Sequence, residues 1–174
     1  MTFQDFRQKL KNFTLQKAYH RLRDGLWSTH SNLLPVRPAG DLPDETQRKY
    51  CKGTFVPVAE ENIQDCAAFE NPNHYVPVYR DMLQRGDYIH YGYVDGECVF
   101  RHCLQKSGQV TLQGCTVRTL SSQEAYIHYG FCAPKARGLG FHAESIYRFC
   151  TAFPQLQLFA LVREDNAASL RGCF

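Results

Sequence analysis

The chain has 174 residues, 44% of them hydrophobic and 21% charged, which suits one globular domain with its own core and excludes a disordered chain. The formal net charge of +3 is too small and too scattered to predict a nucleic-acid surface. No apolar run approaches the roughly 20 residues of a membrane span, and the opening residues MTFQDFRQKLK lack the apolar core of a secretory signal. We therefore expect a cytoplasmic protein that has no membrane span and does not bind nucleic acid.

Residues 2–24 are predicted to form an amphipathic helix. Phe3, Phe6, Leu10 and Phe13 recur at helical spacing, with Lys and Arg between them. We expect this apolar stripe to dock on the domain or on a partner, and favour this over attachment to a membrane surface.

The next segment, residues 28–52, is rich in proline and is typical of a linker. After it, residues 54–58 (TFVPV) have the composition of a short strand, and Pro57 predicts an edge position. We therefore divide the chain into an N-terminal helix and linker over residues 1–52 and a folded domain over residues 53–174.

Helical and extended patterns fill the rest of the chain. Residues 60–69 and 76–85 are predicted helices on either side of a turn at Asn71-Pro72-Asn73. The remaining predicted elements are strands over residues 88–94, 97–104, 109–120, 124–132 and 157–162, with a hairpin turn at Asp95-Gly96, a helix over residues 138–152, and a short helix capped by Asn166. This order predicts a mixed α+β sheet rather than a doubly wound parallel one.

Eight cysteines are spread along the chain without a CxxC pair. Several lie in apolar runs such as CVFRHCL and YRFCTAF, where a free thiol behaves as a small hydrophobic residue. We therefore expect buried free thiols rather than disulfides. Cys98, His102 and Cys103 offer ligands for zinc, but adjacent residues of a strand point to opposite faces, so we expect no metal site.

One stretch, EAYIHYGFCAPKARGLGFHAESIYRFC, combines a strand, a glycine loop and a helix start. The strand ends at Cys132, and Arg137-Gly138-Leu139-Gly140 opens the helix. Unpaired backbone N–H groups and the helix dipole make such a junction an anion site that suits a pyrophosphate, and glycine lets the phosphates approach the backbone. The same pattern also fits a plain turn between a strand and a helix.

This strand–loop–helix resembles the acyl-CoA-binding segment of the GNAT superfamily of N-acyltransferases. The family motif R/Q-x-x-G-x-G/A aligns with RGLGFH at residues 137–142. The stretch LFALVREDNAASLRGCF resembles the next strand and helix of the family, with Asn166 and Ser169 in place, and GTFVPVAEENIQD resembles its opening strand and helix. The resemblance covers residues 53–174 and implies a mixed, mostly antiparallel central sheet flanked by helices.

The resemblance also implies a co-substrate and its binding residues. The co-substrate is acetyl-CoA or another acyl-CoA, the acceptor is a small-molecule or peptide amine, and no metal is needed. The strand ending at Cys132 is expected to splay from the following strand and to hold the pantetheine. The implied cofactor-binding residues are Phe131, Cys132, Arg137, Gly138, Leu139, Gly140, Phe141, His142 and Asn166.

The resemblance places a catalytic base on the same strand. His128 occupies a position where some family members carry a catalytic histidine, and its near-neutral intrinsic pKa suits proton removal from an amine. Tyr126 and Glu124 share its face by strand alternation and complete the catalytic set. The alternative for His128 is a half-buried ring bonded to a neighbouring strand. His90, in the other YIHYG copy, is expected to be structural, and a role in acceptor binding is the alternative.

The sequence departs from the family at three points. His142 stands where the family has Gly or Ala, so its ring either crowds the loop or replaces a contact. The two YIHYG copies leave room for one extra strand. The printed sequence ends at Phe174, before the last two family strands, and the family's acidic tyrosine would fall on Cys173. The strand over residues 157–162 would then be an edge that a homodimer partner, another segment or a missing C-terminal part covers.

The sequence therefore predicts an N-acyltransferase that moves an acyl group from coenzyme A to an amine by direct attack. A close variant is an acyl-carrier-protein-dependent synthase of N-acyl amino acids or acyl-homoserine lactones. The alternative from a different class is a non-catalytic module that binds a ligand or a partner. A glycine loop that opens onto a cavity favours the enzyme, whereas a loop blocked by His142 favours the binding module.

Overall fold

The computed structural model describes residues 31–36, 51–112, 115–163, 166 and 169. Its elements are β1 (Ser31–Pro35), β2 (Thr54–Pro57), η3 (Ile63–Ala68), α3 (Pro72–Gln84), β3 (Tyr88–Val94), β4 (Glu97–Gln105), β5 (Gln109–Leu112), β6 (Cys115–Thr119), β7 (Glu124–Cys132), η4 (Pro134–Ala136), α4 (Phe141–Ala152) and β8 (Gln157–Arg163). The predicted helix over residues 2–24 lies outside the described residues.

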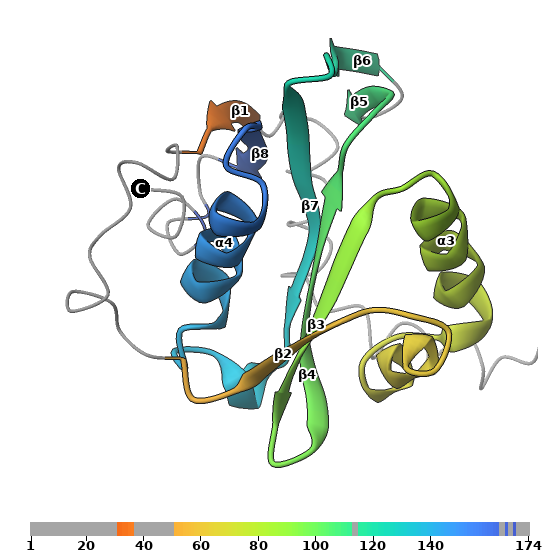
Figure 1. Cartoon of the computed structure of the whole chain (residues 1–174). Coiled ribbons are helices and arrows are strands. Elements are labelled where there is room, and N and C mark those ends of the chain that lie inside the picture. Colours follow the sequence, from red (N-terminus) through yellow and green to blue (C-terminus); the bar gives the residue numbers. More distant parts are fainter. Residues whose placement is uncertain (1–30, 37–50, 113–114, 164–165, 167–168, 170–174) are drawn as a thin grey trace, which may run out of the picture.

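The main sheet has six strands in the order β1-β8-β7-β4-β3-β2 (Figure 1). Only the β7–β8 pair is parallel, and the other neighbours are antiparallel. The sequence prediction of a mixed, mostly antiparallel α+β sheet is therefore confirmed. β2 occupies one edge of the sheet, as Pro57 predicted.

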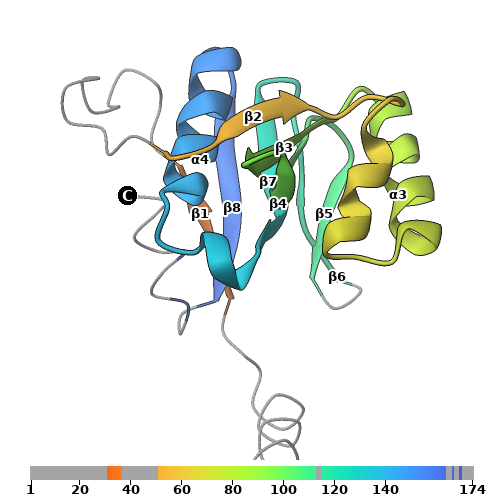
Figure 2. The same cartoon turned by 90° about the horizontal axis from the view of Figure 1, so that it is seen from below.

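Helices cover both faces of the sheet. Figures 1 and 2 show α4 on one face and α3 with η3 on the other. On the α4 face, Ala125 and Ile127 of β7 pack against Ile146 and Phe149 of α4. On the α3 face, the core includes Ile89, Tyr91, Cys103, Val76 and Tyr79. Each large apolar side chain buried in these two layers contributes about 1.5–3 kcal/mol.

The hairpin between β3 and β4 turns at the residues that the sequence indicates. Asp95 and Gly96 both have left-handed backbone, with φ of 51° and 79°. Two such residues in a row form the tight turn whose twist matches that of the flanking strands. This hairpin places His90 directly opposite His102 in the register of the sheet.

Three predicted elements differ from the observed ones. Residues 109–120 form two strands, β5 and β6, which pair as a separate two-stranded sheet and account for the extra strand. The helix predicted over residues 76–85 begins earlier, at Pro72, because the Asn71 side chain accepts a 3.1 Å hydrogen bond from the Asn73 N–H and proline suits the first helical turn. Within residues 60–69 the observed helix is the short η3.

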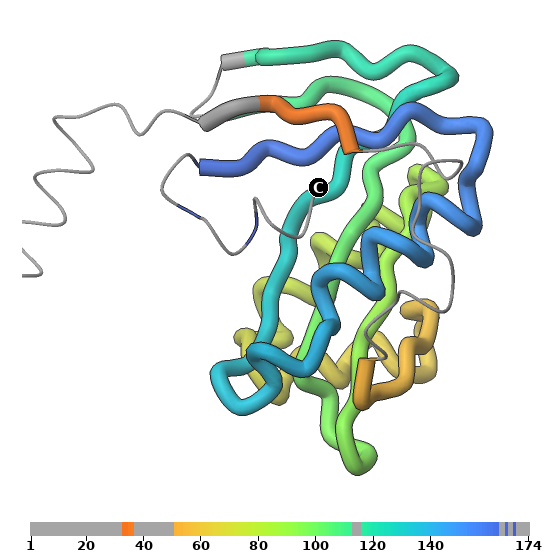
Figure 3. The backbone as a smooth tube through the Cα atoms, turned by 90° about the vertical axis from the view of Figure 1, so that its left-hand side faces the viewer, coloured from red at the N-terminus to blue at the C-terminus, as the bar shows by residue number. Residues whose placement is uncertain are grey.

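The segment read as a linker contains a strand of the main sheet. Ser31–Pro35 forms β1 and pairs antiparallel with β8, and Figure 3 shows the two side by side. The Val36 N–H extends the contact with a 2.8 Å hydrogen bond to the Leu158 carbonyl. The linker prediction is therefore wrong for these residues. The edge of β8 is covered by the same chain, so the reason for expecting a homodimer there no longer holds.

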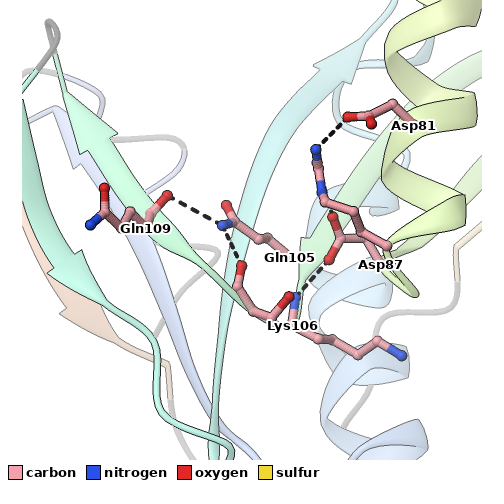
Figure 4. A network of polar contacts seen from close by, with 7 residues as sticks. Asp81, Asp87, Gln105, Lys106 and Gln109 are labelled. Carbon is pink, nitrogen blue, oxygen red and sulfur yellow. Dashed lines mark hydrogen bonds and ion pairs between the residues drawn. The ribbon is translucent and has the colours of Figure 1, made fainter.

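Polar contacts fix the turn before β3 to the turn after β4 (Figure 4). Asp87 is 6% exposed, and its Oδ1 accepts a 2.9 Å hydrogen bond from the Lys106 N–H. The Arg85 guanidinium reaches both Asp87, at 3.3 Å, and Asp81. The Gln105 side chain donates to the Ser107 carbonyl at 2.7 Å. A buried carboxylate with these partners is stable because each lost contact with water is replaced.

Six cysteines of the described residues are free thiols, and four of these six are buried as predicted. Cys66, Cys98, Cys103 and Cys150 are buried, whereas Cys51 and Cys132 are partly exposed. Burial raises the pKa of Cys98 and of Cys103 to about 12, so both thiols stay protonated. Across the described part of the chain, the helices are too short or too polar to cross a membrane.

Candidate functional site

A β-bulge in β7 is the first feature of the candidate site. Between the pairs Cys103–His128 and Arg101–Phe131, β7 has one residue more than β4. Tyr129, within this bulge, has a left-handed backbone with φ of 48°, which is uncommon for a residue other than glycine. The bulge changes the side-chain alternation of the strand, so residues on its two sides are aimed independently.

Arg101 of β4 holds the bulge from the α3 face. Its side chain is 4% exposed, and its Nε donates a 2.7 Å hydrogen bond to the Tyr129 carbonyl. Its Nη1 contacts both the Glu70 carboxylate and the Tyr79 hydroxyl. A buried arginine with so many partners is a rigid anchor. We did not single out Arg101 from the sequence, although a charged residue within the apolar run CVFRHCL was a usable signal.

β7 and β8 diverge next to the bulge. Their parallel ladder joins residues 124–127 to residues 157–160 and ends at the pair Ile127–Ala160. β7 nevertheless runs on to Cys132, and β8 runs on to Arg163. Beyond Ile127 the ladder no longer occupies that edge of β7, whose backbone groups can then bind water or a ligand. The structure thus has the divergence expected of the strand that ends at Cys132.

The glycine loop and the start of α4 follow directly. Gly138 and Gly140 have left-handed backbone, with φ of 80° and 87°, and Gly140 is the N-cap of α4. The Phe141 side chain, 2% exposed, anchors the helix start by stacking on Phe100 with a 5.4 Å centroid distance. The first N–H groups of α4 have no partner within the helix and carry the positive end of its dipole.

A cavity of about 670 Å³ joins the bulge, the end of β7 and the glycine loop. Its lining residues are Phe100, Gly130, Phe131, Cys132, Ala136, Arg137, Gly138, Gly140, Phe141, His142, Ala143, Asn166 and Ser169. The structure therefore brings together all the predicted cofactor-binding residues except Leu139. Leu139 instead packs against the apolar cluster of Val99, Phe100, Ala136 and Phe141, so its expected contact with a ligand is not supported.

Two of these lining residues come from the segment after β8. The Asn166 side chain accepts a 3.1 Å hydrogen bond from the Ser169 N–H, as the predicted helix cap requires. Asn166 lines the cavity, and its contact with a cofactor stays a prediction. Cys173, where the family's tyrosine acid would fall, lies outside the described residues.

His142 lines the cavity without blocking the loop. Its ring centroid lies 5.1 Å from that of His102, between α4 and the sheet. Its Nε2 is buried and has no hydrogen-bond partner among the described residues. Burial lowers the pKa of His142, so the ring is neutral at physiological pH. A buried imidazole nitrogen without a partner, beside a cavity, is a group that a ligand can satisfy.

His128 and Tyr126 lie on the other face of β7. His128 is paired across the ladder with Cys103 of the α3-face core, and its ring is 5.2 Å from that of Tyr126. Burial, helped by the charge of Arg101, lowers the pKa of His128 to about 4. The pKa of His128 in the fold is therefore well below its near-neutral intrinsic value, and its role as the base stays a prediction. The His128 Nε2 is buried and unpartnered within the described residues, so the bond to a neighbouring strand weighed as the alternative is not seen for this atom.

Glu124 is held away from the cavity. Its carboxylate forms an ion pair with Arg118 and accepts a 3.0 Å hydrogen bond from the Ser121 N–H. The Arg118 hydrogen bond lowers the pKa of Glu124 to about 2. Gly130 lies six positions further along β7, which is about 20 Å in an extended strand. Its distance from the cavity and its pairing argue against a catalytic role for Glu124.

A second polar cluster lies under α4 and includes His90, which we expected to be structural. The Ser145 Oγ is 2.7 Å from the His90 Nε2 and 2.7 Å from the His102 Nδ1. All three side chains are buried. We did not single out Ser145 from the sequence, because a serine within a helical pattern gives no local signal of a buried partner on a strand. No group of three or more His, Cys, Asp or Glu side chains within the described ranges is placed to hold a metal ion.

Comparisons with known proteins bear on the fold. No protein-family model and no curated protein matches the chain. A conserved protein of unknown function from Staphylococcus epidermidis ATCC 12228 is similar over 88% of this chain, with a TM-score of 0.58 and 15% identity. This chain spans only 60% of the length of that protein.

Two further solved structures carry descriptions of an activity. One is the GCN5-related glucosamine N-acetyltransferase region of a fungal multi-domain GH3 β-N-acetylglucosaminidase, with a TM-score of 0.55 and 16% identity over 91% of this chain and 21% of that one. The other is AAC(6')-Iy with the bisubstrate analogue CoA-S-monomethyl-acetylneamine, with a TM-score of 0.51 and 12% identity over 68% of this chain and 85% of that one. The chain therefore has the fold of the GNAT superfamily.

Proposed function

We propose that the chain is an N-acyltransferase that moves an acyl group, most simply acetyl, from coenzyme A to an amine. The observation that carries this proposal is the cavity of about 670 Å³ that joins the diverging end of β7 to the glycine loop and the first turn of α4. This combination offers an anion site and an open strand edge within one continuous space.

The residues present fit acyl-CoA. The N–H groups at the start of α4 and the exposed Arg137 suit a pyrophosphate, and glycine at 138 and 140 keeps side chains away from it. The open edge of β7 between Gly130 and Cys132 suits the two amides of a pantetheine arm, which would add to the strand as another strand does. Acyl-CoA supplies a thioester, whose carbonyl carbon an amine can attack.

The bulge supplies a rigid wall for this chemistry. Arg101 fixes the Tyr129 carbonyl, so the following backbone groups keep their direction when a ligand arrives. Backbone N–H groups held in place near a carbonyl oxygen stabilise the negative charge that develops on it. Gly130 leaves room for this approach, and only the edge of the His102 ring lies beneath it.

We infer that His128 takes the proton from the acceptor amine. Its low pKa keeps the ring neutral, so the lone pair of its unpartnered Nε2 is available. Tyr126 stacks beside it and fixes the ring. On this face of β7, Phe131 stacks on Phe69 with a 4.4 Å centroid distance, which gives the acceptor side an aromatic wall.

The alternative of a non-catalytic binding module has less support. We expected that module if His142 blocked the loop, but His142 lines the cavity beside Gly130 and Cys132. The solved structure of AAC(6')-Iy with a bisubstrate analogue has a similar fold, which is compatible with a donor and an acceptor that meet in one site. It does not identify the amine that this chain would use.

Isothermal titration with acetyl-CoA tests the proposal. We expect binding with a micromolar to submillimolar Kd, and weaker binding of acetyl-pantetheine, which lacks the phosphates. Equal binding of the two compounds would favour a carrier-protein donor over coenzyme A. No heat of binding at millimolar acetyl-CoA would contradict the proposal.

A further inference from the structure

Three buried side chains form a continuous hydrogen-bonded chain between α4 and the sheet. The Ser145 Oγ of α4 lies 2.7 Å from the Nε2 of His90 and 2.7 Å from the Nδ1 of His102. The exposed fractions of Ser145, His90 and His102 are 0%, 1% and 3%. The His90 ring stacks on Phe149 with a 4.5 Å centroid distance and an interplanar angle of 9°, which fixes its orientation.

The two ends of this chain lie beside two different cavities. At one end, a methyl group placed on Gly130 would lie 3.0 Å from the His102 Nε2, and Gly130 lines the cavity proposed for acyl-CoA. At the other end, His90 lines a second cavity of about 560 Å³ between α4 and strands β2 and β3. Glu144 and Arg148 of α4 line this second cavity too. The chain thus crosses beneath α4 from one cavity to the other.

Hydrogen-bond chemistry links the proton positions of the two rings. A serine hydroxyl donates one hydrogen bond and accepts others. If the Ser145 hydroxyl donates to the His102 Nδ1, then His102 carries its proton on Nε2. His90 then also carries its proton on Nε2 and donates it to the Ser145 oxygen. If the hydroxyl donates to the His90 Nε2, both rings carry the proton on Nδ1. Moving one proton along the chain converts the first arrangement into the second.

We propose that His90, Ser145 and His102 form a proton relay that delivers a proton from the second cavity to the sulfur that leaves in acyl transfer. This proposal rests on the proposed function. As the C–S bond breaks, the His102 Nε2 gives its proton to the sulfur and its Nδ1 takes the hydroxyl proton of Ser145. Ser145 takes the Nε2 proton of His90, and the His90 Nδ1 takes a proton from water in the second cavity. One proton enters, one leaves, and each ring ends in its other neutral form.

The surroundings favour a relay over a charged histidine. Both rings are buried between α4 and the sheet, so a positive charge on either would be desolvated, and the nearby charges of Arg101 (for His102) and Arg148 (for His90) would add repulsion. In the relay neither ring becomes an imidazolium, because each ring gains a proton on Nδ1 in the same step in which it loses one from Nε2. A thiolate left in a cavity is costly without a proton donor.

Nitrogen NMR of the ligand-free protein tests the wiring directly. In a long-range ¹H–¹⁵N spectrum of the ¹⁵N-labelled chain, His90 and His102 should both carry the proton on Nε2. In Ser145→Ala, the same spectrum should show His102 as a mixture of its two neutral forms. A wild-type pair with Nε2–H on His90 and Nδ1–H on His102 would mean that the hydroxyl only accepts, and would overturn the proposal. Nδ1–H on both rings would also overturn the proposal, because the His102 Nε2 would then have no proton to give to the sulfur.

Kinetics test what the relay does. Ser145→Ala should lower kcat by about 100-fold, the scale of one lost acid catalyst, and leave the KM for acetyl-CoA within about twofold. Thr116→Ala, which removes a hydrogen-bonded hydroxyl from the separate β5–β6 sheet, is the control and should keep the wild-type kcat. A kcat of Ser145→Ala within threefold of wild type would overturn the relay.

The two proposals fail in different ways. Absence of acetyl-CoA binding by the wild-type protein overturns the proposed function, and with it the sulfur as the acceptor of the proton. If the protein binds acetyl-CoA and turns it over but carries Nε2–H on His90 and Nδ1–H on His102, the relay alone is overturned. The NMR measurement uses the wild-type chain, so it does not depend on whether a variant folds.

Discussion

The Nε of Arg101 donates a 2.7 Å hydrogen bond to the carbonyl of Tyr129, the residue of the β7 bulge that has a left-handed backbone. The same guanidinium is buried against Glu70 and Tyr79, so one side chain on the α3 face holds in place a strand whose opposite face lines the cavity. The geometry of the cavity wall therefore depends on a buried ion pair that a ligand in the cavity would not touch.

Arg101→Lys should destabilise the fold. Lysine has no planar fork and cannot reach Glu70, Tyr79 and the Tyr129 carbonyl together, so at least one buried partner is left without its donor. We expect a loss of about 3 kcal/mol in the free energy of unfolding, measured by urea denaturation. The control is Arg85→Lys, whose side chain is 51% exposed and whose pairs with Asp81 and Asp87 should contribute less than about 1 kcal/mol. Equal losses in the two variants would contradict the anchoring role.

Gly138→Ala should weaken acetyl-CoA binding at least tenfold. Gly138 has φ of 80°, open space around its α-carbon and a place in the cavity lining, so the added methyl would face the bound phosphates. Gly86→Ala is a matched control, because Gly86 has φ of 82° and equally open space but lies in the turn before β3. Both variants should lose about 1–2 kcal/mol of stability from the strained backbone. Titration calorimetry separates them, and a similar affinity in both would argue against phosphate binding at the loop.

The elements predicted best from sequence are those that local residues determine. The Asp95-Gly96 turn and the junction from Cys132 to Gly140 depend on backbone conformations that only a few residue types adopt easily, so their positions can be read from the sequence. β1 is different. Its residues resemble a linker, and they form a strand only because β8, more than 120 residues away, offers an open edge. No local pattern contains that information.

The candidate site divides in the same way. Most of the expected cofactor-binding residues lie on one stretch of chain, from Phe131 to His142, whose local pattern the sequence displays, whereas Leu139 of that stretch packs partly buried against the apolar cluster around Phe100 and Phe141. The low pKa of His128 comes from the three-dimensional packing around its ring, which its residue type does not reveal. Ser145 was missed because it lies on α4, whereas its partners His90 and His102 lie on β3 and β4, more than 40 residues earlier in the sequence.

Arg137→Gln should make acetyl-CoA binding weaker and less dependent on salt. An exposed arginine beside the loop contributes a charge-assisted hydrogen bond to a phosphate, and such a bond contributes about 1.5 kcal/mol, or roughly tenfold in Kd. Kd is measured by calorimetry between 50 and 500 mM NaCl, because salt screens this attraction. Lys135→Gln removes the same charge two residues away, where it pairs with Glu97, and should change Kd by less than twofold. An identical salt dependence in both variants would exclude a direct contact from Arg137.

His128→Ala should lower kcat by about 100-fold and leave the Kd of acetyl-CoA within about twofold. The ring lies on the α3 face of β7, so its loss removes the proposed base without altering the loop that binds the phosphates. His74→Ala, at the exposed start of α3, is the control histidine. Steady-state rates with a panel of small amines provide the measurement. A wild-type kcat in His128→Ala would remove His128 from the mechanism.

The buried histidines should make the fold sensitive to acid. Burial lowers the pKa of His90 to about 3 and that of His128 to about 4, whereas an unfolded histidine has a pKa of about 6.5. Between these values the unfolded chain binds more protons than the folded one, so stability is complete above about pH 6.5 and is lost as the pH falls toward 4. Each of these two histidines should lower the free energy of unfolding by about 2 kcal/mol as the pH falls from 7 to 5. In His90→Gln this loss should be smaller by that amount in urea denaturation at the two pH values. An unchanged pH dependence in His90→Gln would mean that His90 binds a proton as readily in the folded as in the unfolded protein, and would contradict the neutral ring that the proton relay requires.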